Sequence, residues 1–273
     1  MAAIAACHVG FNGKPVGQHR LVSQFMKGAR RLLPVTKSLV PSWDLAIVLD
    51  SLTKPPFEPL GQVDMKHLSL KTALLMALAT AKRVSDIHAL SVHEECTQFF
   101  GGTRRVVVKP RPGFVQKNHL VPNTPVTLDA FHPPPFTSEE DERLHCLCPV
   151  RALRMFIDRS EASGKSDRLF VSWAPRVAGK PIAKQTLSHW IVEAIQLAYS
   201  SAGVAAPVGL RAHSTRGVAT SWALFRGVSI QDVCNAASWA SPLTFARFYS
   251  LDVTAPQVAH TVLGVASRRG TDP

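Results

Sequence analysis

The sequence predicts a mainly α-helical protein with a small antiparallel β-sheet, an α+β fold. Apolar residues recur at helical spacing through most of the 273 residues, whereas the region around residues 99–128 has short β-type runs next to a Gly-Gly turn. A hydrophobic content of 46%, with 13 Phe and 5 Trp, supplies the side chains for a sizeable core. This composition excludes a disordered chain.

Residues 1–40 have a composition of their own. Their charged residues are all basic: Lys14, Arg20, Lys27, Arg30, Arg31 and Lys37. Apolar positions at helical spacing predict a helix over about residues 18–31 with a basic face. The prolines between residues 34 and 41 predict a linker. We therefore expect 1–40 to be the end of a truncated N-terminal helical domain plus its linker, and 41–273 to be the main domain.

Three helices are expected at the start of the main domain. Residues 43–49 form an apolar run that stops before the prolines at 55 and 56. Asp64 can cap a helix that continues to about residue 81 and is apolar almost all round, as is typical of a central helix. Arg83 follows at the rim of the core, and Ser85 is a candidate cap for a short helix over residues 86–90.

The β-type region comes next. Phe99-Phe100, the turn Gly101-Gly102 and the run from Arg104 to Lys109 predict a β-hairpin, and residues 126–128 predict a third strand. Residues 101–125 hold five basic residues and no acidic one. Residues 133–142 are rich in proline and then acidic, which predicts an exposed loop.

The rest of the chain is expected to be helical. Pro149 suits the first position of a helix that continues to about residue 157. A second apolar face runs over residues 187–198 and is ended by Gly203. The last third breaks at Gly227 and again at Ser241-Pro242, where a Ser-Pro start predicts a short helix over residues 242–249.

Charge and motif content narrow the function. A net charge of +12 and a pI near 9.9 predict a polyanionic partner, with double-stranded DNA or another nucleic acid first and a membrane surface second. No apolar run reaches the length of a membrane span.

The segment from His145 to Cys148 has no second ligand pair at a usual spacing, and glycine-rich phosphate loops are missing, so we expect neither a metal nor a cofactor. Five cysteines predict reduced thiols and an intracellular location.

A few residues together could supply the chemical groups needed for nucleophilic attack on a DNA phosphate. Catalysis of that reaction needs cations on the non-bridging oxygens, a nucleophile, and a proton donor for the leaving oxygen. Arg83 and Arg216 can grip phosphate oxygens through planar guanidinium groups. Tyr249 carries a hydroxyl nucleophile, and His213, three residues before Arg216, can meet the phosphate together with it. The structural alternatives are a helix-end cation, a capped helix start and a core tyrosine.

These residues resemble the catalytic domain of tyrosine recombinases, the phage-integrase-like family. Arg83-Val84-Ser85-Asp86 matches an Arg-x-Ser-Glu-type motif with Asp in place of Glu, and His213-Ser214-Thr215-Arg216 matches the His-x-x-Arg motif. Tyr249 lies at the spacing of the nucleophile, and Trp239 lies one residue from the usual His-or-Trp position. The resemblance extends from about residue 2 to residue 266. Segments such as Thr244-Phe245-Ala246-Arg247-Phe248-Tyr249 are similar in sequence to recombinases of DIRS- and Ngaro-type retrotransposons.

The resemblance implies a reaction and a set of roles. Tyr249 would cut DNA to give a 3′-phosphotyrosine and a free 5′-hydroxyl, and the reverse step would rejoin the strands for site-specific recombination or integration. A hairpin lysine would protonate the leaving oxygen; Lys117 and Lys109 are both candidates, and the residues favour Lys117. Basic residues that would bind DNA are Lys27, Arg30, Arg31, Arg104, Arg105 and Arg111.

The family also implies a tetramer on DNA and, for a retrotransposon enzyme, a nuclear location. Two alternatives stay open at this point. One is DNA relaxation of the type IB topoisomerase kind, which uses the same catalytic set. The other is an inactive DNA-binding remnant of a mobile element.

Overall fold

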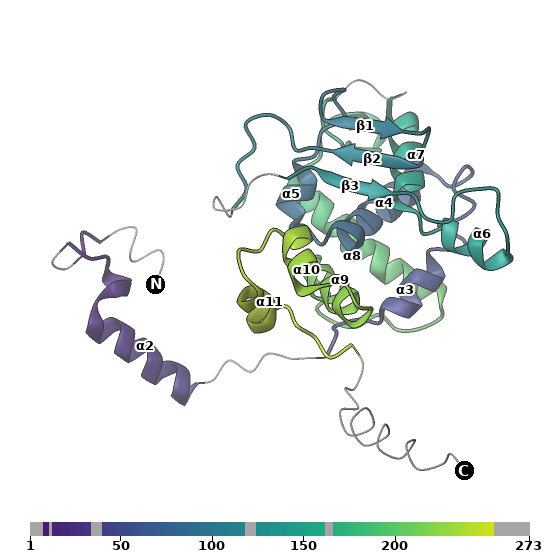
Figure 1. Cartoon of the computed structure of the whole chain (residues 1–273). Coiled ribbons are helices and arrows are strands. Elements are labelled where there is room, and N and C mark those ends of the chain that lie inside the picture. The colour runs from purple at the N-terminus through teal and green to yellow at the C-terminus, as the bar shows by residue number, and fades with distance from the viewer. Residues whose placement is uncertain (1–7, 11–12, 34–39, 118–123, 162–165, 254–273) are drawn as a thin grey trace, which may run out of the picture. The chain divides into compact units, whose positions relative to one another are not determined.

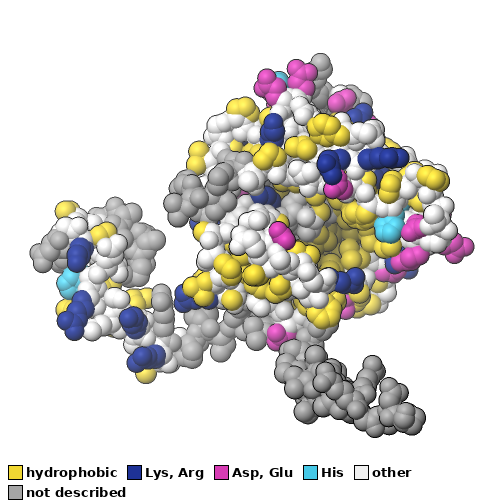
Figure 2. Space-filling model, in the orientation of Figure 1, with side chains coloured by type: hydrophobic (Ala, Val, Ile, Leu, Met, Phe, Trp, Pro, Cys, Tyr) yellow, Lys and Arg dark blue, Asp and Glu magenta, His cyan; other side chains and the backbone are white. Residues whose placement is uncertain are grey.

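The computed structural model describes residues 8–10, 13–33, 40–117, 124–161 and 166–253. It separates into two compact units, residues 1–38 and 39–273. Unit 1 contains the short 3₁₀ helix η1 (Val16–Gln18) and the helix α2 (Arg20–Leu32), which agrees with the helix expected from the apolar spacing. Lys and Arg side chains are spread along this unit (Figure 2).

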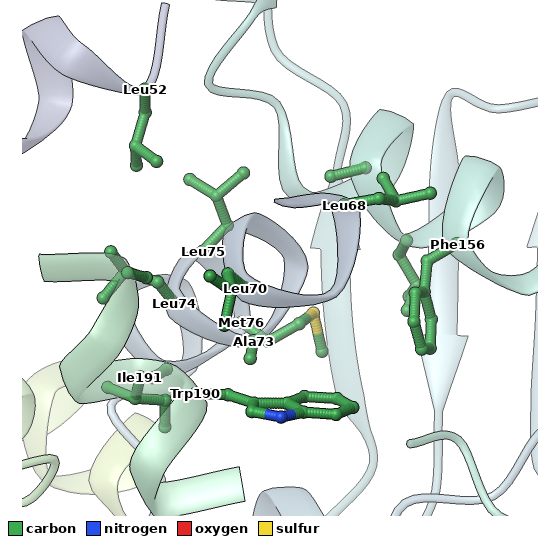
Figure 3. Packing of buried hydrophobic residues seen from close by; sticks show 14 of the residues in the cluster. Leu52, Leu68, Leu70, Ala73, Leu74, Leu75, Met76, Phe156, Trp190 and Ile191 are labelled. Atoms are coloured by element: carbon green, nitrogen blue, oxygen red, sulfur yellow. The ribbon is translucent and has the colours of Figure 1, made fainter. Parts of the chain in front are cut away.

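A buried helix, α4 (Met65–Thr80), is the centre of unit 2. Asp64 caps it by accepting a hydrogen bond from the backbone N–H of His67, at 2.8 Å. Every residue from Leu68 to Ala77 is buried, because α4 packs against α7 (Pro149–Glu161), α8 (Lys184–Ser201) and α9 (Ser214–Phe225). Figure 3 shows α4 side chains gathered with Phe156 of α7 and Trp190 of α8. Each fully buried leucine contributes about 1.5–3 kcal/mol to this core.

A three-stranded antiparallel sheet covers part of this core, in the order β1 (Thr97–Phe100), β2 (Arg105–Val108) and β3 (Val126–Asp129). Val106 faces Phe99 on one side and Leu128 on the other. In Figure 1 the sheet lies at the top of unit 2, and α9, α10 (Ile230–Ala237) and α11 (Pro242–Phe248) lie below it. The expected hairpin and third strand are therefore both present.

Two local expectations need correction. The helix after α4, α5 (Val84–His88), begins one residue before Ser85, and Arg83 is its N-cap. The side chain of Asp86 accepts a hydrogen bond from the Arg83 backbone N–H at 3.3 Å. Asp86 therefore provides the capping hydrogen bond that was expected from Ser85. The acidic stretch expected to be a loop is the first turn of an exposed helix, α6 (Glu139–His145), capped by Ser138. Negative charge is favourable at a helix N-terminus, and a prediction from loop composition alone ignores this effect.

The remaining elements differ from expectation only at their ends. The helix expected over residues 43–49 is α3 (Leu45–Ser51), which Asp44 caps at 2.7 Å from the Ala46 backbone nitrogen. A short 3₁₀ turn, η2 (Pro175–Val177), precedes α8. The last helix stops at Phe248, so Tyr249 follows the helix as its C-cap.

Candidate functional site

Tyr249 is held by contacts on both of its sides. Its backbone N–H donates to the carbonyl of Phe245 at 2.8 Å, and its ring lies 4.5 Å from the ring of Trp239, measured between centroids. Its hydroxyl oxygen is 3.0 Å from Nε2 of His213. A neutral imidazole can accept the phenol proton across that distance.

The start of α9 supplies both His213 and Arg216. His213 is the N-cap, and Arg216 is the third residue of the helix, so the two side chains share one face. Gly217 keeps the next position clear, because a Cβ there would lie 3.3 Å from the carbonyl oxygen of Tyr249. The helix can therefore pack directly against the backbone that carries the tyrosine.

Arg216 is buried and fixed by two carbonyl groups. Its side chain is 1% exposed; Nε donates to the carbonyl of Ala81 at 2.8 Å, and Nη2 donates to that of Ala237 at 2.6 Å. The guanidinium carbon lies 5.0 Å from the ring centroids of both Trp239 and Tyr249. Burial lowers the pKa of Arg216 to about 10, so the group stays charged at neutral pH.

Arg83 comes from a different part of the chain. The helix α4 ends at Ala81 in a left-handed conformation (φ 49°), which turns the chain so that Arg83 begins α5. Its positive charge helps to lower the pKa of Arg216 and of His213, which places the three groups in one electrostatic environment. For His213 the larger cause is desolvation, which favours the neutral imidazole.

Three buried N–H donors near Tyr249 have no hydrogen-bond partner among the described residues. They are Nη1 of Arg83, Nη1 of Arg216 and Nε1 of Trp239. Buried donors are nearly always paired in folded proteins, and an unpaired one costs about 1–3 kcal/mol. Two of the three belong to positively charged groups. The arrangement therefore suits an oxyanion with several acceptor oxygens.

Arg83, His213 and Tyr249 open onto a cleft of about 1070 Å³, whereas Arg216 and Trp239 lie behind its lining, against the ring of Tyr249. Arg83, Lys117, His213 and Tyr249 line one part of it. The other wall is a face of α8 that carries mainly polar side chains: Lys184, Gln185, Ser188, His189, Val192 and Gln196. The one acidic residue of the lining, Glu193, is paired with Lys66 at 2.6 Å. The cleft therefore has a positive electrostatic character.

The two candidate lysines lie in different places. Lys117 lines the cleft, and its charge contributes to the lowered pKa of His213. Lys109 follows β2, is exposed, and its Nζ lies 3.4 Å from the carbonyl oxygen of Glu95, outside the cleft lining. Lys117 is therefore the candidate that shares the cleft with Tyr249.

The other basic residues predicted to bind DNA are solvent-exposed where the structure describes them. Arg104, Arg105 and Arg111 are exposed on and beside the sheet, and Arg105 is paired with Asp129 at 2.5 Å. Lys27 and Arg31 are exposed on α2, whereas the side chain of Arg30 lies outside the described part.

Sequence reasoning missed the wall formed by α8 and the contact made by Lys82. The α8 signal was present, since Lys184, Ser188, Val192 and Gln196 recur at four-residue spacing on a face beside the apolar one. Lys82 gave no signal beyond its position next to Arg83. Its Nζ lies 2.7 Å from the hydroxyl of Ser238, a contact across 156 positions that no local pattern predicts.

No group of three or more His, Cys, Asp or Glu side chains in the part of the chain that the structure describes is arranged to hold a metal ion. No helix in the same part is long and apolar enough to cross a membrane.

Comparison with known proteins gives matches of structure only. No family model and no curated protein matches the sequence. The XerH site-specific recombinase bound to difH substrate, in a pre-cleavage complex, matches with a TM-score of 0.53 at 14% identity, over 99% of this chain and 70% of that one. The Tn1549 transposon integrase in complex with transposon right end DNA matches with a TM-score of 0.55 at 12% identity, over 97% and 75% of the two chains. The chain therefore has the fold of a tyrosine recombinase catalytic domain.

Proposed function

We propose that this protein cuts and rejoins double-stranded DNA through a covalent tyrosine intermediate. The observation that carries the proposal is the set of buried, unpaired donors on Arg83, Arg216 and Trp239. Arg216 and Trp239 lie against the ring of Tyr249, whose hydroxyl contacts His213. A phosphodiester offers two non-bridging oxygens to such donors, and its phosphorus can then be reached by the phenol. No other chemistry suggested by the sequence uses all of these groups together.

Each residue has a distinct part in this scheme. The oxygen of Tyr249 attacks phosphorus while His213 accepts the phenol proton, which its lowered pKa allows at neutral pH. The new bond joins the tyrosine oxygen to the phosphorus on the DNA 3′ side, and the bond to the 5′ oxygen breaks. Lys117 gives its proton to that oxygen, so a free 5′-hydroxyl leaves. Arg83, Arg216 and Trp239 hold the charge that develops on the non-bridging oxygens.

The fold neighbours support DNA as the substrate, since the matched structures of XerH and of the Tn1549 integrase are complexes with DNA. We propose recombination or integration as the biological outcome, in an assembly of several protomers on DNA. The basic residues of the sheet, with those of unit 1, would hold the duplex as a clamp. An element of the DIRS or Ngaro type is the proposed origin, and the nucleus the proposed location.

The decisive assay uses a nicked DNA duplex, from which the short cut strand diffuses away and traps the covalent product. Wild-type protein should form an adduct that survives a denaturing gel. Tyr249→Phe removes one hydroxyl and should abolish the adduct while DNA affinity stays the same. The matched control is Tyr199→Phe, since Tyr199 is 4% exposed and its hydroxyl accepts a hydrogen bond from the Asp44 backbone N–H at 2.6 Å. An adduct with Tyr249→Phe would move the nucleophile elsewhere.

The leaving-group acid can be tested separately. Lys117→Ala should slow cleavage of ordinary DNA, and a substrate with sulfur in place of the bridging 5′ oxygen should restore it, because a thiolate leaves without a proton. Lys109→Ala should have little effect with either substrate. Rescue of Lys109→Ala instead would assign the acid to that residue. A supercoiled plasmid separates the alternative activity, since relaxation without exchange of strands would indicate a topoisomerase.

A further inference from the structure

Lys82 and Ser238 form a side-chain link between two distant segments. Nζ of Lys82 donates to the hydroxyl of Ser238 at 2.7 Å. Ser238 has no exposed surface, and Lys82 is partly buried. Lys82 is not part of the cleft lining; it borders a separate small pocket together with Asp86 and Gln116. The Lys82 side chain therefore contacts Ser238 inside the protein and does not face the cleft proposed to bind DNA.

The link lies beside the two groups that hold Arg216. The carbonyl of Ala81 directly precedes Lys82, and that of Ala237 directly precedes Ser238. These two carbonyls accept the hydrogen bonds from Nε and Nη2 of Arg216, so their separation fixes where Nη1 points. A bond between the next residues on each side would keep that separation constant.

Ser238 also sets the direction of Trp239. It ends α10 in a left-handed conformation (φ 53°, ψ 49°), a position where glycine is usually favoured. The serine therefore carries backbone strain that glycine would avoid, and its hydroxyl is what glycine would lack. Trp239 follows immediately and stacks against Tyr249.

We propose that Lys82 is a positioning residue: through Ser238 it holds the Ala81 and Ala237 carbonyls at the distance that aims Arg216, and it holds Trp239 against Tyr249. This inference rests on the proposed function for its effect on rate, but its structural part stands alone. Lys82 touches no substrate in this scheme. Its positive charge acts beside Arg216, Arg83 and Asp86, not on the phosphate.

The test compares Lys82→Met with Ser238→Gly. Both remove the link: methionine keeps most of the aliphatic stem, and in Ser238→Gly the relief of the left-handed backbone offsets part of the cost of the lost hydrogen bond. Single-turnover adduct formation at saturating protein should fall by about 10- to 100-fold in both, in line with the cost of a misplaced group far from the reacting atoms. DNA affinity should stay unchanged. The double variant should be no slower than either single variant, because both break one contact.

Two further measurements separate the possible failures. The bridging-sulfur substrate should not rescue Lys82→Met; rescue would make Lys82 itself the acid and overturn the positioning role. Crystal structures of Lys82→Met and wild type should show the guanidinium of Arg216 and the indole of Trp239 displaced in the variant. If neither group moves, the inference is wrong, whatever the activity. If wild-type protein forms no adduct, the proposed function fails while the structural comparison still decides this inference. Lys54→Met is the control, since Lys54 is exposed and, among the described residues, its ammonium pairs with Asp50 alone.

Discussion

Replacement of Arg216 by lysine keeps a positive charge but removes the planar fork, and this isolates what the geometry contributes. Two of the three guanidinium nitrogens are committed to the carbonyls of Ala81 and Ala237, which leaves Nη1 for the phosphate. A lysine has one nitrogen and cannot reproduce all three directions. At least one buried carbonyl then loses a charge-assisted bond, which costs about 1.5–3 kcal/mol. For a unit of this size that corresponds to a fall in Tm of roughly 3–12 °C.

The loss of activity should exceed what the lost stability explains. Loss of one preorganised donor to a developing oxyanion slows chemistry by about 10²–10³-fold, and we expect that fall in single-turnover adduct formation of Arg216→Lys below its Tm. Arg159→Lys is the control: Nη1 of Arg159 donates to the carbonyl of Val63 at 2.6 Å, on a helix that does not line the cleft. It should lower Tm without slowing cleavage. Arg216→Lys protein that cleaves as fast as wild type would show that Arg216 is a structural cation.

Three further predictions concern pH, stability and DNA binding. The pKa of His213 is lowered from 6.5, so the rate of adduct formation should be flat around neutral pH and fall only at a pH below 6.5; a fall that begins above pH 7 would exclude His213 as the base. Burial alone would raise the pKa of Glu58, but the hydrogen bond from Arg151 and the charge of Lys71 hold it below 4.5. A lowered carboxyl pKa stabilises the fold above pH 4.5, and this stabilisation is lost as the pH falls through the folded-state pKa. Glu58→Gln should therefore cost about 3–5 kcal/mol in urea unfolding at pH 7 and weaken the acid dependence; unchanged stability would mean that the buried pair with Lys71, at 2.5 Å, contributes nothing. Replacement of Lys27, Arg30 and Arg31 by Ala should reduce the slope of log affinity against log salt by about 2–3; an unchanged slope would remove unit 1 from the DNA interface.

Local patterns were enough to predict most of the helices and the sheet. The apolar positions of α4 recur in every direction around the helix, and a helix of that kind can only be central. Asp64 and Ser241-Pro242 marked helix starts correctly because these signals act within one turn. Helix α6 was missed because the run of prolines followed by acidic residues predicts a loop. The signal that would have identified the helix is Ser138, which caps its acidic first turn.

The sequence by itself determined the chemical inventory: the positive charge, the order of Arg83, His213, Arg216 and Tyr249, and the pairing of His213 with Arg216 on one turn. Only the tertiary structure decided which lysine shares the cleft with Tyr249, because Lys109 and Lys117 are eight residues apart and differ in which face of the fold they reach.

The same holds for the anchoring of Arg216 and for the link between Lys82 and Ser238. Their partners lie 135, 21 and 156 positions away along the chain. Spacing within a helix or a strand is set by backbone geometry over a few residues and can be read from a sequence. A contact between the segments that follow α4 and α10 depends on how every helix between them packs, and that packing is fixed only when the core forms.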